Sequence, residues 1–441
     1  MKTVSGFSKL TKLEKINFLV ENYLQSSSKN SETIKSFWHD DAEAQRIFDD
    51  FSENTITNFY APYGVVPNFL LNDKIYCVPM VIEESSVVAA CAKSAKFWQD
   101  RGGFKAKIID TEKVGQVHFI WKGESEKLFS FFNETAKPKI LEYVKPLVQN
   151  MEKRGGGLKD IELRDHTDKE DGYYQVWATF ETCDAMGANF INSVLESIGK
   201  SLRDQVFESE LFVGTEKELL VVMAILSNYT PNCRVQAWVE CPVKELEDSG
   251  LEMSAELFVE KFQRAVRIAH IDVNRATTHN KGIFNGIDAV ILATGNDFRA
   301  IEACGHTYAA KDGQYKSLTH CEVKDGMFKF WIDIPLALGT VGGLTALHPM
   351  AKISLDMLGR PGAKELMMIV AASGLAQNFG ALRSLVTSGI QKGHMKMHLI
   401  NILNQLEATE EEREVVKREF ENQVVSFQGV RATLAKLRNL Q

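Results

Sequence analysis

The stretch RATTHNKGIFNGIDAVILATGND is apolar and rich in small residues, yet it has charged and amide side chains near both ends. Arg275, Lys281 and Asn285 lie in its first half, and Asp297 closes it. Because an unpaired ion is costly in an apolar interior, these groups either end a core element at the surface or meet in a site. In a site, a cation beside a carboxylate could stabilise a developing oxyanion. Spacing alone leaves both interpretations open, and surface charge at helix ends is the commoner one.

The spacing of the small residues predicts a helix, although AVILA alone could equally be a buried strand. Small residues recur every three or four positions: Gly282, Gly286, Ala289 and Ala293. Such a smooth face lets another backbone approach closely. On one straight helix, Lys281 and Asn285 share a face, whereas Lys281 and Asp297 lie about 24 Å apart. Both charged groups can serve one site only if the segment breaks or a second subunit contributes one of them.

A pair of carboxylates lies in VIEESSVVAA, between an apolar strand and an apolar helix. Glu83 and Glu84 could simply face the positive end of the helix, with Ser85 and Ser86 in its first turn. Alternatively, one of them is a partly buried carboxylic acid that donates protons in a site. The residues alone favour the first interpretation.

The stretch CDAMGANFINS places Asp184 where a helix N-cap is expected, followed by small residues in the first turn. Free N–H groups at such a helix start suit anions such as phosphates, although a well-capped helix without a ligand would have the same sequence. No G-x-G-x-x-G stands between a strand and a helix here. Any dinucleotide site in this protein is therefore not of the usual Rossmann type.

Two histidines near the C-terminus, His394 and His398 in GIQKGHMKMHLIN, stand four residues apart. That spacing can hold a metal on one helix face, but the glutamate of H-E-x-x-H is missing and no third ligand stands nearby. We therefore expect no metal site. A histidine in a charged C-terminal segment is better interpreted as a proton donor that arrives when the segment closes.

Composition limits the class of protein. The chain has 441 residues, 44% of them hydrophobic, which is enough for two or three domains. A net charge of −7 argues against nucleic acid as the main partner. The seven cysteines lie far apart without a C-x-x-C pair, as expected for reduced thiols in a cytoplasm. With no signal peptide and no long uncharged apolar run, we expect a soluble cytoplasmic protein without a membrane partner.

The elements that must position these motifs form an α+β fold. Between about Glu112 and Pro242 the pattern alternates as strand, helix, strand, strand, helix, strand, the ferredoxin-like (βαββαβ) order. We place this small domain at 113–220, inserted into a large, mostly helical domain made of 1–112 and 221–378. NDK near residue 73 predicts a hairpin turn, and Ser254–His270 predicts a periodic helix. A helical, highly charged segment, 379–441, closes the chain as a flap.

Taken together, the four motifs resemble one family: 3-hydroxy-3-methylglutaryl-coenzyme A (HMG-CoA) reductase, of the bacterial second class. The resemblance is collinear from about Ser52 to the C-terminus. It is carried by EESSVVAA, DAMGAN, RATTHNKGIFNGIDAVILATGND and GIQKGHM. Departures are ENTIT at Glu53–Thr57, where the family has ENVIG, Ser85 where proline is common, and Leu344 where a smaller residue is common.

The resemblance implies a role for each matching residue. The catalytic residues of the family fall on Glu84, Lys281, Asp297 and His394, and His398 matches a second, less central histidine. Its substrate-binding residues fall on Ser86, Arg275, Asn285, Gln377 and Asn378. Its nicotinamide-dinucleotide motif falls on Asp184, Met186, Gly187 and Asn189. Lys153 and Arg154, beside a glycine turn, offer cations for a 2′-phosphate, so we favour NADPH over NADH.

The implied reaction reduces the thioester of HMG-CoA to the alcohol of mevalonate, with two hydrides and release of coenzyme A. Lys281 would stabilise the oxyanion, Glu84 would supply protons and His394 would protonate the departing thiolate. The family also implies a closing flap and an obligate homodimer with active sites at the interface. Two alternatives stay open: the same enzyme working oxidatively in mevalonate breakdown, and a non-catalytic protein that binds coenzyme A esters.

Overall fold

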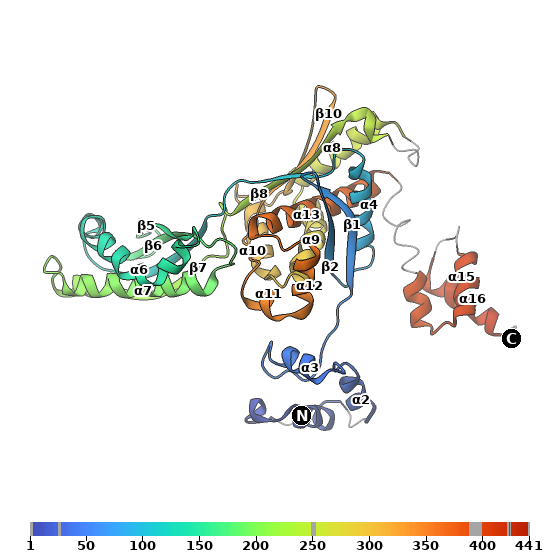
Figure 1. Ribbon diagram of the computed structural model, residues 1–441, viewed down its shortest axis with the longest axis horizontal. Coiled ribbons are helices and arrows are strands. Elements are labelled where there is room, and N and C mark those ends of the chain that lie inside the picture. Colours follow the sequence, from blue (N-terminus) through green and yellow to red (C-terminus); the bar gives the residue numbers. More distant parts are fainter. Residues whose placement is uncertain are drawn as a thin grey trace.

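A computed structural model describes residues 3–24, 28–247, 253–387, 399–420, 423 and 425–439. A central body carries a smaller unit at one side, and short helices lie at both ends of the chain (Figure 1). The described residues form one two-stranded and two four-stranded sheets together with many helices. The expected mixed α+β class is confirmed.

The smaller unit is a four-stranded antiparallel sheet with helices α6 and α7 packed side by side against it. Its strands and helices follow in the order β4 (Lys113–Ile120), α5 (Ser125–Phe131), α6 (Lys137–Glu152), β5 (Gly157–Asp165), β6 (Tyr173–Glu181), α7 (Ala188–Glu208) and β7 (Leu220–Leu226). The sheet order is β5-β6-β4-β7, with every neighbouring pair antiparallel. A π-helical turn at Phe132–Ala136 joins α5 to α6, and α6 continues through Pro146. Pro146 therefore lies inside α6 without ending the helix.

The body consists of a hairpin and a second sheet packed with helices. Its strands are β1 (Tyr63–Leu71), β2 (Lys74–Val81), β3 (Lys105–Ile108), β8 (Arg234–Pro242), β9 (Thr319–Lys324) and β10 (Met327–Pro335). Its helices are α4 (Val87–Gln99), α8 (Ala255–Ile271), α9 (Val273–Ala293), α10 (Phe298–Ala309), α11 (Gly343–Leu347), α12 (Pro349–Met357) and α13 (Ala363–Val386). Asn72 and Asp73, with φ values of 48° and 65°, form the predicted turn between β1 and β2.

Helices α9 and α13 lie against one another at the centre of the body (Figure 1). A Cβ atom on Gly286 would come within 2.6 Å of the backbone oxygen of Ser373, so glycine is what allows this approach. Gly282 meets nothing within 4 Å. The predicted smooth face of α9 therefore contacts α13 at Gly286, while Gly282 faces open space.

Helix α13 is long and apolar enough to cross a membrane by length and composition alone, the one such helix among the described residues. However, 78% of its apolar window is buried inside the protein. Its burial against α9 and α4 accounts for its composition.

The two ends of the chain form separate small helical units. The N-terminal helices are α1 (Lys12–Asn22), α2 (Ser28–Ser36) and α3 (Ala42–Asp49). The C-terminal helices include α15 (Glu410–Glu419) and α16 (Phe427–Asn439), which enclose their own apolar cluster around Leu403 and Val416. Most side chains of the charged helix α15 are exposed. Glu412 is buried, and its carboxylate accepts a hydrogen bond from Arg438.

Candidate active site

Three of the predicted site residues meet at one carboxylate oxygen. Lys281 Nζ donates a hydrogen bond to Glu84 Oε2, and Asn285 Nδ2 donates to the same oxygen over 3.3 Å. Glu84 lies in the turn between β2 and α4, whereas Lys281 and Asn285 lie one turn apart on α9. The side chains of Lys281 and Glu84 are 58% and 40% exposed. The ion pair is therefore formed within the chain but open to water, so a dry site needs a further covering element.

The turn that carries Glu84 has an unusual backbone. Ser86, the N-cap of α4, has φ 75°, and its side chain makes no capping bond. Helix α4 begins at Val87, so Ser85 and Ser86 precede the helix and do not form its first turn. A non-glycine residue in the left-handed region costs about 1–2 kcal/mol, and such strain is concentrated at functional sites. The geometry is compatible with the substrate-binding role implied for Ser86.

A buried polar network supports α9 from behind. His279, Thr319 and Asn378 are at most 1% exposed. Thr319 Oγ1 donates to Asn378 Oδ1 (2.9 Å), so it must accept from His279 Nε2 (2.6 Å). This order makes His279 the Nε2–H tautomer, and its Nδ1 finds no partner among the described residues. Burial, followed by the nearby charge of Arg275, lowers the pKa of His279 to about 3.

The remaining predicted substrate residues on α9 and α13 are distributed around that network. Arg275 is half-buried one turn before His279, and burial lowers the pKa of its guanidinium. Asn378 lies inside the protein, bonded to Thr319 and to the backbone oxygen of His279 (3.4 Å). Gln377 is 5% exposed and packs against Gly286. In this chain Asn378 therefore holds α9 in place and does not line the surface around Glu84.

Asp297 lies at the far end of α9 from Lys281. It is the N-cap of α10, accepting from the N–H groups of Arg299 (3.1 Å) and Ala300 (3.3 Å). Burial alone would raise its pKa, but Arg299 and these donors lower it below its usual value. Because α9 runs unbroken over Val273–Ala293, Lys281 lies about 18 Å before the end of the helix, and Asp297 follows the turn beyond that end. One chain alone does not bring them together.

The predicted dinucleotide loop joins the smaller unit to the body, and one expectation about it was wrong. The N-cap of α7 is Gly187, with φ 93°, and not Asp184. The left-handed turn at Gly187 directs the Asp184 carboxylate away from α7. Asp184 Oδ1 instead accepts from the N–H of Ala363, the first residue of α13 (2.7 Å), and its backbone oxygen accepts from Thr340 (2.8 Å).

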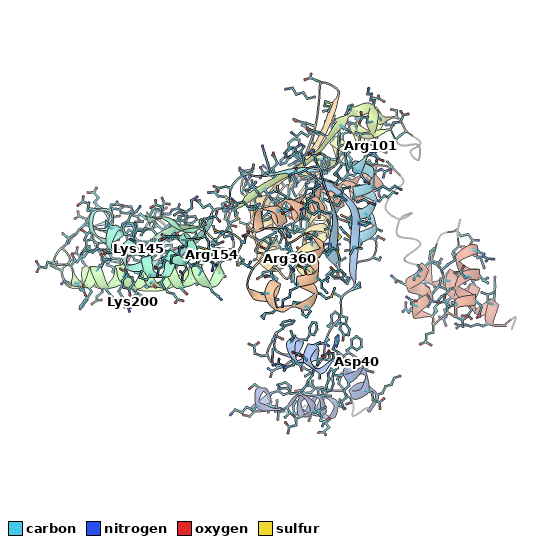
Figure 2. All side chains as sticks on the ribbon, viewed as in Figure 1. Asp40, Arg101, Lys145, Arg154, Lys200 and Arg360 are labelled. Carbon is cyan, nitrogen blue, oxygen red and sulfur yellow. The ribbon has the colours of Figure 1, made fainter. Side chains whose placement is uncertain are left out.

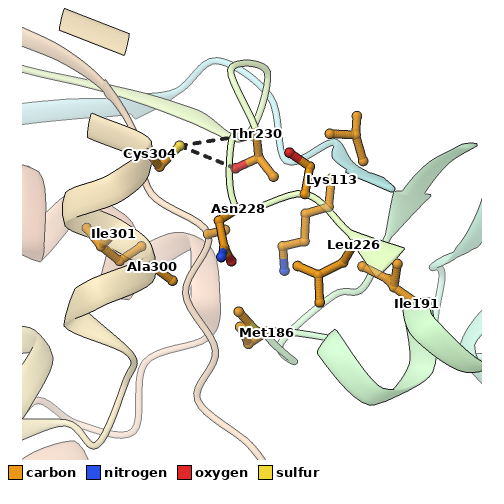
Figure 3. Close-up of a pocket in the computed structure, with 12 residues that line it drawn as sticks. Lys113, Met186, Ile191, Leu226, Asn228, Thr230, Ala300, Ile301 and Cys304 are labelled. Atoms are coloured by element: carbon orange, nitrogen blue, oxygen red, sulfur yellow. Dashed lines mark hydrogen bonds between the residues drawn. The ribbon is translucent and has the colours of Figure 1, made fainter. Parts of the chain in front are cut away.

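Groups suited to a phosphate lie near this loop. Helix α7 begins at Ala188, and its N-cap, Gly187, has no side chain that could cap it. The first N–H groups of the helix are therefore available to an anion. Lys153 and Arg154 are exposed at the end of α6, and Figure 2 shows Arg154 on the side of the smaller unit towards the body. The thiol of Cys183 donates to the backbone oxygen of Arg154 (3.2 Å), which ties this end of α6 to the loop. Met186 lines a pocket between α10 and the smaller unit (Figure 3), and Asn189 is exposed in the first turn of α7.

Two further expectations concern metals and histidines. Within the described ranges, no three His, Cys, Asp or Glu side chains gather as metal ligands. His394 and His398 lie outside the described residues, so the structure says nothing of their place. All seven cysteines are free thiols.

Sequence reasoning missed one residue beside the dinucleotide loop. Lys113, the first residue of β4, is 5% exposed, and its ammonium bonds Thr182 and the backbone oxygen of Ala185 (2.8 Å). A lysine that opens a strand matches no motif. The only available signal was its position at the start of the inserted domain.

Comparison with known proteins identifies the family of this chain. The family model for hydroxymethylglutaryl-coenzyme A reductase matches residues 14–399, and the chain therefore belongs to that family. It is 37% identical over 413 residues to the 3-hydroxy-3-methylglutaryl-coenzyme A reductase of Archaeoglobus fulgidus, covering 93% of this chain and 88% of that protein. It is 33% identical over 406 residues to a probable enzyme of the same name from Borreliella burgdorferi, covering 92% and 89%.

The solved structures that resemble the chain include one described as class II. The reductase of Streptococcus pneumoniae matches with a TM-score of 0.72 and 32% identity, covering 99% of this chain and 100% of that one. A structure of the class II enzyme from the same organism, bound to NADPH in open conformations, matches with a TM-score of 0.71 and 33% identity, covering 87% and 100%. The predicted membership of the bacterial second class is confirmed.

Proposed function

We propose that this protein reduces the thioester of HMG-CoA to mevalonate and free coenzyme A, using NADPH. The observation that carries the proposal is the Glu84 carboxylate bonded by both Lys281 and Asn285. Lys281 and Asn285 follow Glu84 in the sequence by 197 and 201 positions. A cation and a proton donor are thus held within reach of one reacting carbonyl.

Each member of the triplet has a task that the reaction requires. The Lys281 ammonium stabilises negative charge on the thioester oxygen as it grows. In its anionic form the Glu84 carboxylate keeps the lysine charged when the site closes. After it takes a proton from solvent, the same group is a carboxylic acid and delivers that proton to the hemithioacetal and aldehyde stages. Asn285 fixes the carboxylate that both tasks share. Ser86, Arg275 and Gln377 are proposed to contact the substrate, and Asn378 to position α9.

The smaller unit, which extends to the end of β7 at Leu226 and not only to the expected residue 220, is proposed to hold the dinucleotide, and bound NADPH would supply the hydride. The uncapped start of α7 and the exposed cations Lys153 and Arg154 fit an anionic ligand with a 2′-phosphate. Asp184, Met186, Gly187 and Asn189 form the loop against which it would lie. The body, which includes the whole of α13 up to Val386, would bind the substrate. The expected boundary at 378/379 was too early, because it falls inside that buried helix. The segment after α13 would act as the flap, with His394 protonating the thiolate.

A homodimer is proposed because the chain alone does not assemble the site. Asp297 is remote from Lys281 within one chain, and a partner's copy would supply it. The α11–α12 region also exposes a group of large apolar side chains, which a second copy could cover: Leu344, Leu347, Met350, Ile353 and Met357. No metal is invoked, and a cytoplasmic location stays a prediction.

The test is oxidation of NADPH with HMG-CoA, followed by nicotinamide absorbance. Two cofactors oxidised per ester consumed support the proposal, whereas binding without oxidation would favour a non-catalytic ester-binding protein. The oxidative direction is tested with mevalonate, coenzyme A and NADP⁺ or NAD⁺. Lys281→Ala should abolish turnover yet stay folded, because so exposed an ion pair contributes at most about 1 kcal/mol to stability. Exposed Lys159→Ala is a matched control that should stay active.

A further inference from the structure

The buried ammonium of Lys113 lies under the loop that leads into α7. It donates to the Thr182 hydroxyl and to the backbone oxygen of Ala185 (2.8 Å), and Thr182 itself donates to the same carbonyl (2.6 Å). The backbone N–H of Ala185 closes the turn by donating to the backbone oxygen of Thr182 (3.0 Å). The Lys113 side chain therefore bonds both ends of the four-residue turn 182–185.

This turn is in contact with the start of α7 on one side and with the body on the other. The Thr182 side chain packs so closely on Gly187 that a Cβ there would lie 2.5 Å from Thr182 Cγ2. Asp184 bonds the first residue of α13, and Ala185 forms a β-bridge with Val341. The arrangement at Lys113 thus reaches both the anion-binding end of α7 and the helix that packs on α9.

Among the described residues, no carboxylate is bonded to the Lys113 amine. Glu181, which precedes the turn, is engaged with the Thr111 hydroxyl and the N–H of Cys183. Burial lowers the pKa of Lys113, and nearby Cys233 and Glu181 oppose that shift. A buried amine without hydrogen bonds is costly, so the bonds to Thr182 and Ala185 are what hold this side chain in the interior. Figure 3 shows the side chain reaching towards Met186 from β4, across the pocket from Ala300 and Ile301 on α10.

We propose that Lys113 is a positioning residue for the dinucleotide: by bonding both ends of the 182–185 turn, its buried amine holds the start of α7 in the shape that receives the phosphates. The inference rests on the proposed dinucleotide site. The ester site at Glu84 uses none of these groups.

The experiment compares Lys113→Met with wild type by NADPH fluorescence titration, HMG-CoA calorimetry and thermal unfolding. Methionine has a similar length, and Thr182 still satisfies the Ala185 carbonyl, so the variant should fold. We expect the NADPH Kd to rise about tenfold, the scale of the one or two hydrogen bonds that hold the turn, with the HMG-CoA Kd and kcat at saturating NADPH little changed. Lys159→Met, an exposed lysine of the same domain bonded to Glu112, should leave NADPH binding unchanged.

Thr182→Val removes one hydrogen-bond acceptor of Lys113 but keeps the lysine itself, and should raise the NADPH Kd a few-fold. It decides the matter if Lys113→Met does not fold: unchanged NADPH binding would then overturn the proposal. Normal NADPH binding by Lys113→Met, or parallel loss of both ligands and of thermal stability, would overturn it too. Failure of the wild-type protein to bind NADPH would instead reject the proposed dinucleotide site.

Discussion

Replacing His279 by glutamine should remove a specific part of the acid sensitivity of this protein. In the folded state, burial lowers the pKa of His279 to about 3, against an ordinary value of 6.5. The unfolded chain therefore binds a proton that the folded chain refuses, and stability must fall as the pH falls below 6.5. Glutamine can still donate to Thr319 from a similar position, but it does not titrate.

The size of the effect follows from the two pKa values. Between about pH 7.5 and about pH 5.5 the histidine should cost the wild-type protein about 1.4 kcal/mol of unfolding free energy. The loss continues at about 1.4 kcal/mol per unit until the folded pKa is approached. Other buried histidines, such as His320 with a pKa lowered to about 4 by burial, contribute equally to both proteins and cancel in the comparison.

Urea unfolding of wild type and His279→Gln across this pH range is the appropriate assay. The difference in unfolding free energy between the two proteins should change with pH by that amount, in favour of the variant at low pH. Parallel pH dependences would refute the assignment of His279 as a neutral, buried member of the network behind α9. A large loss of stability at neutral pH would mean that glutamine does not replace the bond to Thr319.

Four further variants test other parts of the fold and site. Gly286→Ala should lower the unfolding free energy by about 1–3 kcal/mol, because its Cβ meets the α13 backbone, whereas Gly282→Ala should be neutral or slightly stabilising in denaturant titrations. Ser86→Gly should relieve strain and raise stability by up to about 1 kcal/mol while weakening HMG-CoA binding in calorimetry; equal affinity would remove Ser86 from the substrate site. Changing Lys153 and Arg154 together to alanine should raise KM for NADPH about tenfold and leave KM for NADH unchanged, and an equal rise for both cofactors would contradict a 2′-phosphate contact.

Local patterns in the sequence predicted much of the fold. Ser254 caps α8, which spans Ala255–Ile271, almost the predicted helix, because capping and periodicity act within a few residues. The strand and helix order of the smaller unit was legible for the same reason. The N-cap of α7 was assigned wrongly, since Asp184 and Gly187 are both common at helix starts and only the contact with Ala363 decides between them.

The site could be predicted in part. Lys281 and Asn285 share a helix face by spacing alone, but their contact with Glu84 depends on how α9 packs beside β2, which no local pattern encodes. The motif resemblance supplied that link. Asn378, matched by the same resemblance, is held by Thr319 in the interior, a difference that only tertiary packing reveals. Lys113 went unnoticed because its partners are a hydroxyl and a carbonyl far along the chain.

The unbroken course of α9 has a consequence for mixtures of defective subunits. If partner chains exchange Asp297, a subunit with Lys281→Ala and a subunit with Asp297→Ala are each inactive in their own pairs. In a mixed pair, one centre lacks both groups and the other has both intact. Activity would then reappear when two inactive preparations are allowed to exchange subunits. Whether a centre is active would therefore depend on the pair of chains that forms it and not on either chain alone.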